Sequence, residues 1–159
     1  MVYKLLNGLS SAEMDQVLAL GSRDKIASGG PLFRLGDHAE HLYLIERGQI
    51  RLSFPMLVRG KEESVFFEEK SPGDTVGWSA MVPPYRFTLS ATAPLETEVI
   101  TLSRESLSAF FERSPVTGRR ISLNLAVLVG QRLQLVQAMW MREIQRAVEL
   151  RSATPAVAR

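Results

Sequence analysis

A glycine and an arginine nine positions apart make residues 77–86 the part of this chain best suited to hold an anion. Gly77 precedes a short run that can form a helix, and two prolines then lead to Arg86. A glycine turn that opens a helix directs several backbone N–H groups toward one point, which suits a phosphate. The guanidinium of Arg86 can hold the same anion through two parallel hydrogen bonds. We therefore predict that Gly77–Ala80 and Arg86 bind a small anionic ligand.

Side chains around this turn could add contacts to the ligand. Trp78 can stack on a base or can fill the pocket itself. Thr88 and Ser90 can hydrogen-bond a ligand if their side chains point into the fold, and are otherwise ordinary strand residues with satisfied hydroxyls. The predicted ligand-binding residues are Gly77, Trp78, Ser79, Ala80, Arg86 and Thr88.

Two histidines raise the alternative of a metal centre. His38 and His41, with Glu46, are superficially similar to the ligand set of cupin metalloenzymes. On an extended strand His38 and His41 would point to opposite faces, and the chain has no third histidine. With no cysteine, thiolate zinc sites, disulfides and cysteine nucleophiles are excluded. We favour two exposed loop histidines, and we expect neither a metal nor catalysis, because no nucleophile and base have a recognisable arrangement.

The elements that position these residues begin with a short helix and continue as a β-rich body. Residues 10–20 open with Ser10 and carry Glu13 three positions on, the spacing of a capping box. Between about 30 and 102, short β-prone runs are separated by glycines 12 or 13 positions apart: Gly36, Gly48, Gly60 and Gly73. Turns at this interval are typical of an antiparallel barrel or jelly roll.

Individual strands can be placed within this body. Residues 49–56 alternate apolar and polar side chains, as a half-buried strand does, and 64–67 and 98–102 are further predicted strands. Residues 59–61 have the composition of a hairpin tip, and 71–74 that of a tight turn.

A long helix is predicted to end the chain. Ser103 can cap a short helix that ends near Phe111, and Ser114 followed by Pro115 can begin a second one. The second can run to about Leu150, with apolar residues at steps of three and four: Leu125, Val129, Leu133, Val136, Trp140, Ile144 and Ala147.

This helix is too long to be covered by one compact body. About 35 residues span roughly 50 Å, whereas a domain of this size is about 30–40 Å across. We therefore predict a homodimer through residues 119–150. The alternative is that the apolar stripe is core, with a break near Gly130.

Charge is divided unevenly along the chain. Residues 1–118 hold 12 Lys and Arg against 15 Asp and Glu, whereas 119–159 hold 7 Arg against 2 Glu. The basic end could touch nucleic acid nonspecifically, but arginines on the polar face of a dimer helix are the simpler interpretation. The longest apolar stretch, 123–130, is too short to span a membrane. Without a signal sequence, a cytoplasmic protein is expected.

The order and spacing of several motifs resemble a known family. The motifs are Phe33-x-x-Gly36-Asp37, Leu42-Tyr-Leu-Ile45-x-x-Gly48-x-Ile50-x-Leu52, Pro72-Gly-Asp74, Val76-Gly77 and Arg86. Together with the terminal helix they resemble the cyclic-nucleotide-binding domain, and more narrowly the effector half of the catabolite-activator and fumarate-nitrate-regulator family. The resemblance implies an eight-stranded jelly roll with flanking helices and a ligand inside it. It also implies that the last helix closes the pocket and pairs two subunits.

The chain departs from that family in three respects. Members that bind cyclic nucleotides usually have a glutamate after the cassette glycine that accepts the ribose 2′-hydroxyl, and here Trp78 takes that place. A buried hydroxyl without its partner costs about 1–3 kcal/mol. The interval from Gly77 to Arg86 is also slightly short. Only eight residues follow Arg151, too few for a recognition helix, so no sequence-specific DNA binding is expected.

The sequence thus predicts a mainly β protein: a jelly-roll sensor domain with an N-terminal helix over 1–118, a dimerisation helix over 119–151 and a flexible tail over 152–159. We expect a complete, stand-alone, non-enzymatic regulatory module that binds a cyclic nucleotide or other phosphate-bearing ligand, or is degenerate for it. One alternative is a ligand-free protein-interaction subunit whose pocket Trp78 fills; the other is a cupin-like enzyme. The expected partners are a second copy and a further protein, without a membrane.

Overall fold

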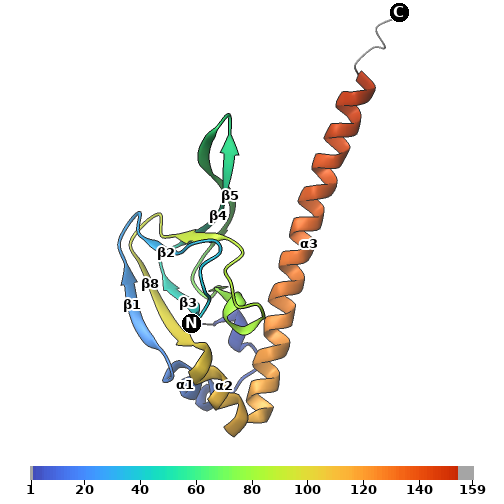
Figure 1. Ribbon diagram of the computed structural model, residues 1–159. Coiled ribbons are helices and arrows are strands. Elements are labelled where there is room, and N and C mark those ends of the chain that lie inside the picture. The colour runs from blue at the N-terminus through green and yellow to red at the C-terminus, as the bar shows by residue number, and fades with distance from the viewer. Residues whose placement is uncertain (1, 154–159) are drawn as a thin grey trace, which may run out of the picture. The chain divides into compact units, whose positions relative to one another are not determined.

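The computed structural model describes residues 2–153. The chain divides into two units, Met1–Leu125 and Ala126–Arg159. Within the described residues, the first unit contains eight strands in two four-stranded antiparallel sheets (Figure 1). The predicted jelly roll, with a helix before it and a long helix after it, is therefore confirmed.

Each sheet pairs strands that are distant in sequence. The first has the order β1 (Ser22–Ile26), β8 (Thr97–Ser103), β3 (His41–Arg47) and β6 (Thr75–Val76). The second has the order β2 (Pro31–Phe33), β7 (Ser90–Thr92), β4 (Ile50–Val58) and β5 (Lys61–Lys70). Buried apolar side chains of β3, β4, β6, β7 and β8 form the core: Leu42, Leu44, Ile45, Ile50, Leu52, Val76, Ala91, Val99, Ile100 and Leu102.

The β4–β5 hairpin is longer than the sequence pattern predicts. Its ladder continues past Met56 to the pair Val58 and Lys61. Arg59 and Gly60 turn the tip with φ values of 50° and 78°. Leu57 is 79% exposed, and in Figure 1 the hairpin extends away from the other strands. Because both faces of the outer hairpin meet water, its side chains need not alternate, and the pattern that predicts the inner part is lost.

The shorter helices begin at the caps predicted for them. In α1 (Ser11–Leu18), Ser10 and Glu13 form the complete capping box. In α2 (Arg104–Arg113), the Ser103 hydroxyl accepts a hydrogen bond from the Ser106 N–H at 3.1 Å. Two short 3₁₀ helices, η1 (Lys4–Leu6) and η2 (Trp78–Met81), complete the first unit.

The last helix, α3 (Pro115–Ala153), is continuous through Gly130. Its first turns are held by the N-terminal segment: the Thr117 hydroxyl donates to Glu13 Oε1 at 2.8 Å, and Asn124 Nδ2 donates to the Leu5 carbonyl at 2.8 Å. Of the predicted tail, the first two residues belong to α3, and 154–159 lie outside the described residues. Among the described helices, α3 included, none is long and apolar enough to cross a membrane.

Candidate functional site

Gly77 forms the left-handed turn that opens the predicted anion site. It has φ 78° and ψ 25° and directly precedes η2. A Cβ atom at this position would lie 2.9 Å from the His41 carbonyl oxygen and 3.1 Å from Tyr43 Cδ2. Both the dihedral angle and the close approach of the backbone therefore require glycine. At the start of a helix the first N–H groups have no partner within the helix, and in η2 these belong to Trp78 and Ser79.

The residues that follow Gly77 pack unequally. Ser79 and Ala80 are buried, at 4% and 0% exposure, and Ala80 N–H donates to the Gly77 carbonyl at 3.0 Å. The Trp78 side chain is only half-buried. We call Gly77–Met81 the cassette turn. Its backbone has the geometry expected from the sequence, but its tryptophan does not lie fully inside the roll.

Arg86 is an exposed residue that contacts the Gly36 loop. Its side chain is exposed, and Nη1 donates a hydrogen bond to the Gly36 carbonyl at 2.8 Å. Burial alternates along the segment that leads into β7, because Phe87 and Leu89 are buried whereas Arg86 and Thr88 are exposed. The Arg86 guanidinium is thus held by the Gly36 carbonyl, and the Thr88 side chain is exposed, so the binding roles predicted for both residues stay predictions.

An aromatic stack packs against the cassette turn. The rings of Phe33 and Phe87 are parallel within 9°, with centroids 3.8 Å apart. Tyr43 continues the stack, 5.9 Å from Phe33. Phe87 Cε1 would be 3.4 Å from a Cβ at Gly77, so the stack packs directly against the cassette turn. Burial raises the pKa of the Tyr43 hydroxyl.

Part of this stack is predictable from the sequence, although the family motif points instead to Arg86 as the inward residue. Residues 86–91 alternate polar and apolar, and that alternation alone places Phe87 inward and Arg86 outward. The pairing of Phe87 with Phe33 and Tyr43 has no comparable signal, because the three residues come from segments far apart in the chain.

An ion pair on β5 is a second feature that sequence reasoning missed. Lys70 Nζ contacts Glu68 Oε1, and both side chains are about four-fifths buried. In the register of β4 and β5, Glu68 lies opposite the buried Leu52, and Lys70 lies opposite the buried Ile50. The pair is thus on the inward face of the sheet, where charge interacts more strongly than in water.

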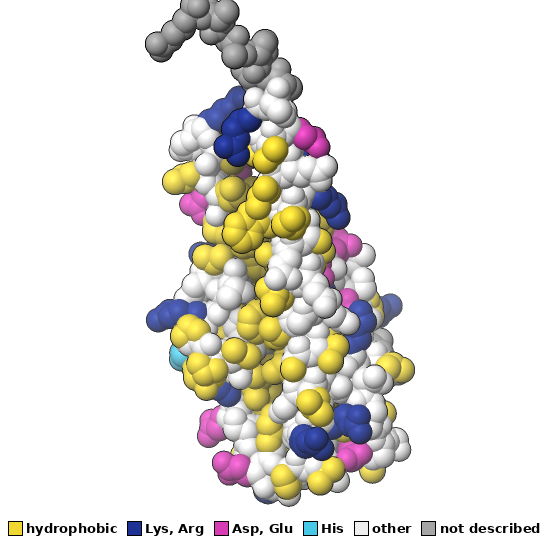
Figure 2. Space-filling model, turned by 90° about the vertical axis from the view of Figure 1, so that its right-hand side faces the viewer, with side chains coloured by type: hydrophobic (Ala, Val, Ile, Leu, Met, Phe, Trp, Pro, Cys, Tyr) yellow, Lys and Arg dark blue, Asp and Glu magenta, His cyan; other side chains and the backbone are white. Residues whose placement is uncertain are grey.

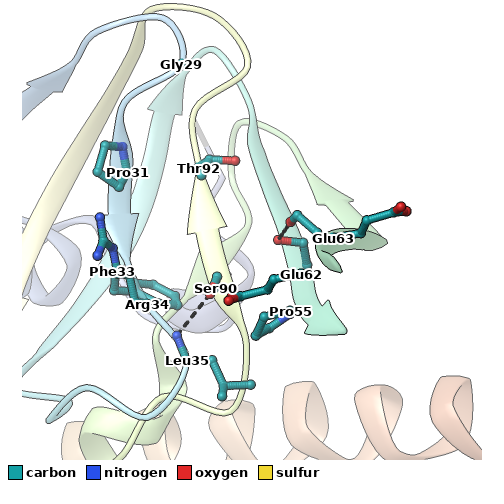
Figure 3. Close-up of a pocket in the computed structure, with 12 residues that line it drawn as sticks. Gly29, Pro31, Phe33, Arg34, Leu35, Pro55, Glu62, Glu63, Ser90 and Thr92 are labelled. Carbon is teal, nitrogen blue, oxygen red and sulfur yellow. Dashed lines mark hydrogen bonds between the residues drawn. The ribbon is translucent and has the colours of Figure 1, made fainter. Parts of the chain in front are cut away.

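Ser90 faces a groove on the opposite face of the same sheet (Figure 3). The groove has a volume of about 760 Å³, and the Ser90 hydroxyl in it accepts a hydrogen bond from the Leu35 N–H at 3.0 Å. Ser64 donates to Ser53 at 2.8 Å across the same surface. The groove also contains Arg34, Glu62, Glu63 and Thr92. Ser90 is therefore an outward-facing strand residue with a satisfied hydroxyl, the alternative left open by the sequence.

The prediction of two exposed loop histidines is confirmed for His38 and wrong for His41, which is half-buried as the first residue of β3. His38 Nδ1 is 2.9 Å from the Tyr85 carbonyl oxygen in a loop, whereas His41 begins β3. Within residues 2–153, three or more His, Asp or Glu side chains are nowhere grouped so that they could hold a metal ion.

Comparison with known proteins agrees with the fold. The profile of the cyclic nucleotide-binding domain matches residues 23–114. The chain is 32% identical over 130 residues to the cyclic AMP receptor protein of Thermus thermophilus, covering 82% of this chain and 57% of that protein. It is 29% identical over 125 residues to the Pycsar effector protein XpPycTIR of Xanthomonas perforans, covering 78% and 39%. The chain thus spans less than two thirds of the length of either relative.

A solved structure gives the same result in three dimensions. The catabolite activator protein of Thermus thermophilus superposes with a TM-score of 0.72 and 29% sequence identity, covering 94% of this chain and 63% of that one. The profile match covers more than half of the chain and includes β1 through α2. The chain therefore belongs to the cyclic nucleotide-binding domain family.

Proposed function

We propose that this chain is a non-enzymatic regulatory module that binds a small nucleotide-like ligand at the cassette turn. The observation that carries the proposal is the left-handed turn at Gly77, which opens η2 beside the aromatic stack. Its backbone N–H groups offer hydrogen bonds to a phosphate, and the aromatic rings offer a surface for a base. Family membership and the relative named for cyclic AMP support the same ligand class.

In this proposal the backbone, rather than Arg86, holds the phosphate. Arg86 is engaged with Gly36 on the outer face, and Trp78 replaces the glutamate that accepts a ribose hydroxyl in the family. Each hydrogen bond to a charged group that is lost costs about 1.5–3 kcal/mol. Loss of either contact alone should weaken binding roughly 10- to 100-fold, and a domain that keeps both should bind the ligand roughly 100- to 10,000-fold more tightly than this chain.

A thermal-shift titration with cyclic AMP, cyclic GMP and cyclic dinucleotides tests this proposal. A ligand at 100 times its Kd adds about 2.7 kcal/mol of stability, which raises the Tm by about 5–11 °C for a chain of this size. The Arg86→Ala variant should retain the shift, and Arg34→Ala, at another exposed arginine, is its matched control. Loss of the shift in Arg86→Ala alone would show that the arginine moves onto the ligand, contrary to the backbone-only site.

A ligand-free interaction subunit is the second candidate function. The favouring observation is the Phe33–Phe87 stack, which already occupies the interior next to Gly77. In this candidate the stack, rather than the half-buried Trp78, is the group that fills the pocket. If this candidate is right, no nucleotide stabilises the wild-type chain. Phe87→Ala would then create a nucleotide-dependent shift that the wild type lacks.

We also propose that α3 pairs two copies of the chain. Its exposed apolar side chains include Leu133, Val136, Trp140 and Ile144, with Trp140 67% exposed. Figure 2 shows hydrophobic side chains gathered along this helix. Their steps of three and four place them on one face, as in a two-stranded coiled coil. An apolar stripe of this length would be unfavourable in water without a second helix to cover it.

Light scattering on Val136→Asp and Gln137→Asp tests the pairing. The two changes are identical and adjacent, but Val136 lies on the apolar face and Gln137 does not. We expect a dimer for the wild type and for Gln137→Asp, and a monomer for Val136→Asp at micromolar concentration. A monomeric wild type would contradict the proposed role of α3.

A further inference from the structure

An apolar cavity lies beside the end of the cassette turn. It has a volume of about 290 Å³ and is bounded by η1, η2, α2 and the first turns of α3. Four of its lining side chains are buried to 97% or more: Leu5, Leu42, Leu107 and Ile121. Protein interiors are packed so closely that voids larger than a water molecule are few. A concavity of this size with fixed apolar walls is therefore unusual.

The chemistry of the lining decides what could occupy this cavity. Ser122 is the single polar residue among the eight that line it, and its hydroxyl donates to the Gly118 carbonyl of the same helix at 2.9 Å. The lining contains no charged side chain. A phosphate or an ammonium group would thus lose its hydration without gaining a partner. The lining excludes nucleotides and favours an uncharged apolar molecule.

The rim of the cavity provides a route of entry. Ser122 is exposed, and Met81, Phe111 and Leu125 are only half-buried. An enclosed apolar cavity of about 150 Å³ is enough to hold benzene. The present volume is about twice as large, which suits molecules between a substituted benzene and a bicyclic hydrocarbon.

We propose that this cavity is a binding site for a compact, uncharged apolar molecule, separate from the nucleotide site at the cassette turn. The walls are preformed by residues that also belong to the core, so the ligand does not have to reorganise them. The site does not depend on the proposed nucleotide binding, because a hydrocarbon uses neither the N–H groups of η2 nor any charge.

Toluene is a suitable probe, with benzoate as its charged counterpart. Methyl-resolved NMR of the full chain should show saturable shifts at Leu5, Leu107 and Ile121 with toluene. Benzoate should cause no such shifts, because its carboxylate would be buried without a partner. Separate titration with cyclic AMP reports on the cassette turn, so failure of one site is distinguished from failure of the other.

A variant that fills the cavity completes the test. Leu107→Phe extends a buried wall into the cavity, whereas Leu123→Phe makes the same change at a position 51% exposed. We expect toluene to bind Leu107→Phe about tenfold more weakly and Leu123→Phe as it binds the wild type. Leu125→Phe is a second filling variant, used if Leu107→Phe does not fold. Absence of saturable binding to the wild type, or equal binding to folded filling variants, would overturn the proposal.

Discussion

Replacement of Phe87 by alanine tests whether the aromatic stack stabilises the roll beside the cassette turn. Phe87 is 6% exposed, and its ring centroid is 3.8 Å from that of Phe33. Truncation of a buried phenylalanine costs about 3–5 kcal/mol, a large part of the 5–15 kcal/mol that stabilises a typical domain. At about 2–4 °C per kcal/mol for a chain of this length, we expect Phe87→Ala to lower the Tm by about 6–20 °C.

Phe66→Ala is the matched control, because it makes the same change where little is buried. Phe66 is 56% exposed on the outer hairpin, and the guanidinium carbon of Arg51 lies 5.8 Å from its ring centroid. An exposed cation–π contact is worth about 0.5–1 kcal/mol, so the Tm should fall by at most about 4 °C. Scanning calorimetry on both variants gives the comparison. Equal losses of stability would refute the view that the stack is part of the core.

Three further predictions concern the turn and the helix ends. Gly77→Ala should destabilise the chain more than Gly36→Ala, as measured by urea denaturation of both variants. Both glycines have φ near 80–90°, which costs alanine about 1–2 kcal/mol. Of the two, only Gly77 is so placed that the new Cβ would meet backbone. Ser103→Ala should cost about 1 kcal/mol through loss of the α2 cap, whereas exposed Ser108→Ala should cost nothing measurable in the same assay. The pKa of Glu13 is lowered chiefly by the hydrogen bond from the Ser10 side chain. Hydrogen bonds from the Ser10 backbone and from Thr117 lower it further. The urea midpoint of the wild type should therefore exceed that of Glu13→Gln by its full amount above the ordinary pKa of glutamate. This difference should disappear as the pH falls through the lowered pKa of Glu13, and a difference that does not depend on pH would contradict the prediction.

The sequence was sufficient for those elements whose determinants are local. The capping box of Ser10 and Glu13 marks α1, and the alternation of residues 49–56 predicts the inner part of β4. The recurring glycines indicate the roll, which the two antiparallel sheets confirm. In each case the pattern arises from contacts within a few residues or from one buried face.

The candidate site depends on contacts between residues far apart in the sequence, which local patterns do not predict. The family motif assigns Arg86 to a ligand, whereas the side chain is exposed and donates to the Gly36 carbonyl, a contact with a residue 50 positions away that no local pattern predicts. The stack of Phe33, Tyr43 and Phe87 requires three segments to converge, and that convergence is a property of the sheet topology. The inward ion pair of Glu68 and Lys70 follows from the β4–β5 register, which includes an irregularity after Leu52.

Backbone amide NMR during titration with cyclic AMP, cyclic GMP and cyclic dinucleotides tests the central claim most directly. If the cassette turn holds a nucleotide through its backbone, the amide resonances of Trp78, Ser79 and Ala80 should shift saturably with one of these ligands. The Arg86→Ala variant should give the same shifts at nearly the same concentration. If the amides of residues 77–81 do not respond to any of the nucleotides, the ligand-binding account is contradicted and the ligand-free interaction subunit takes its place.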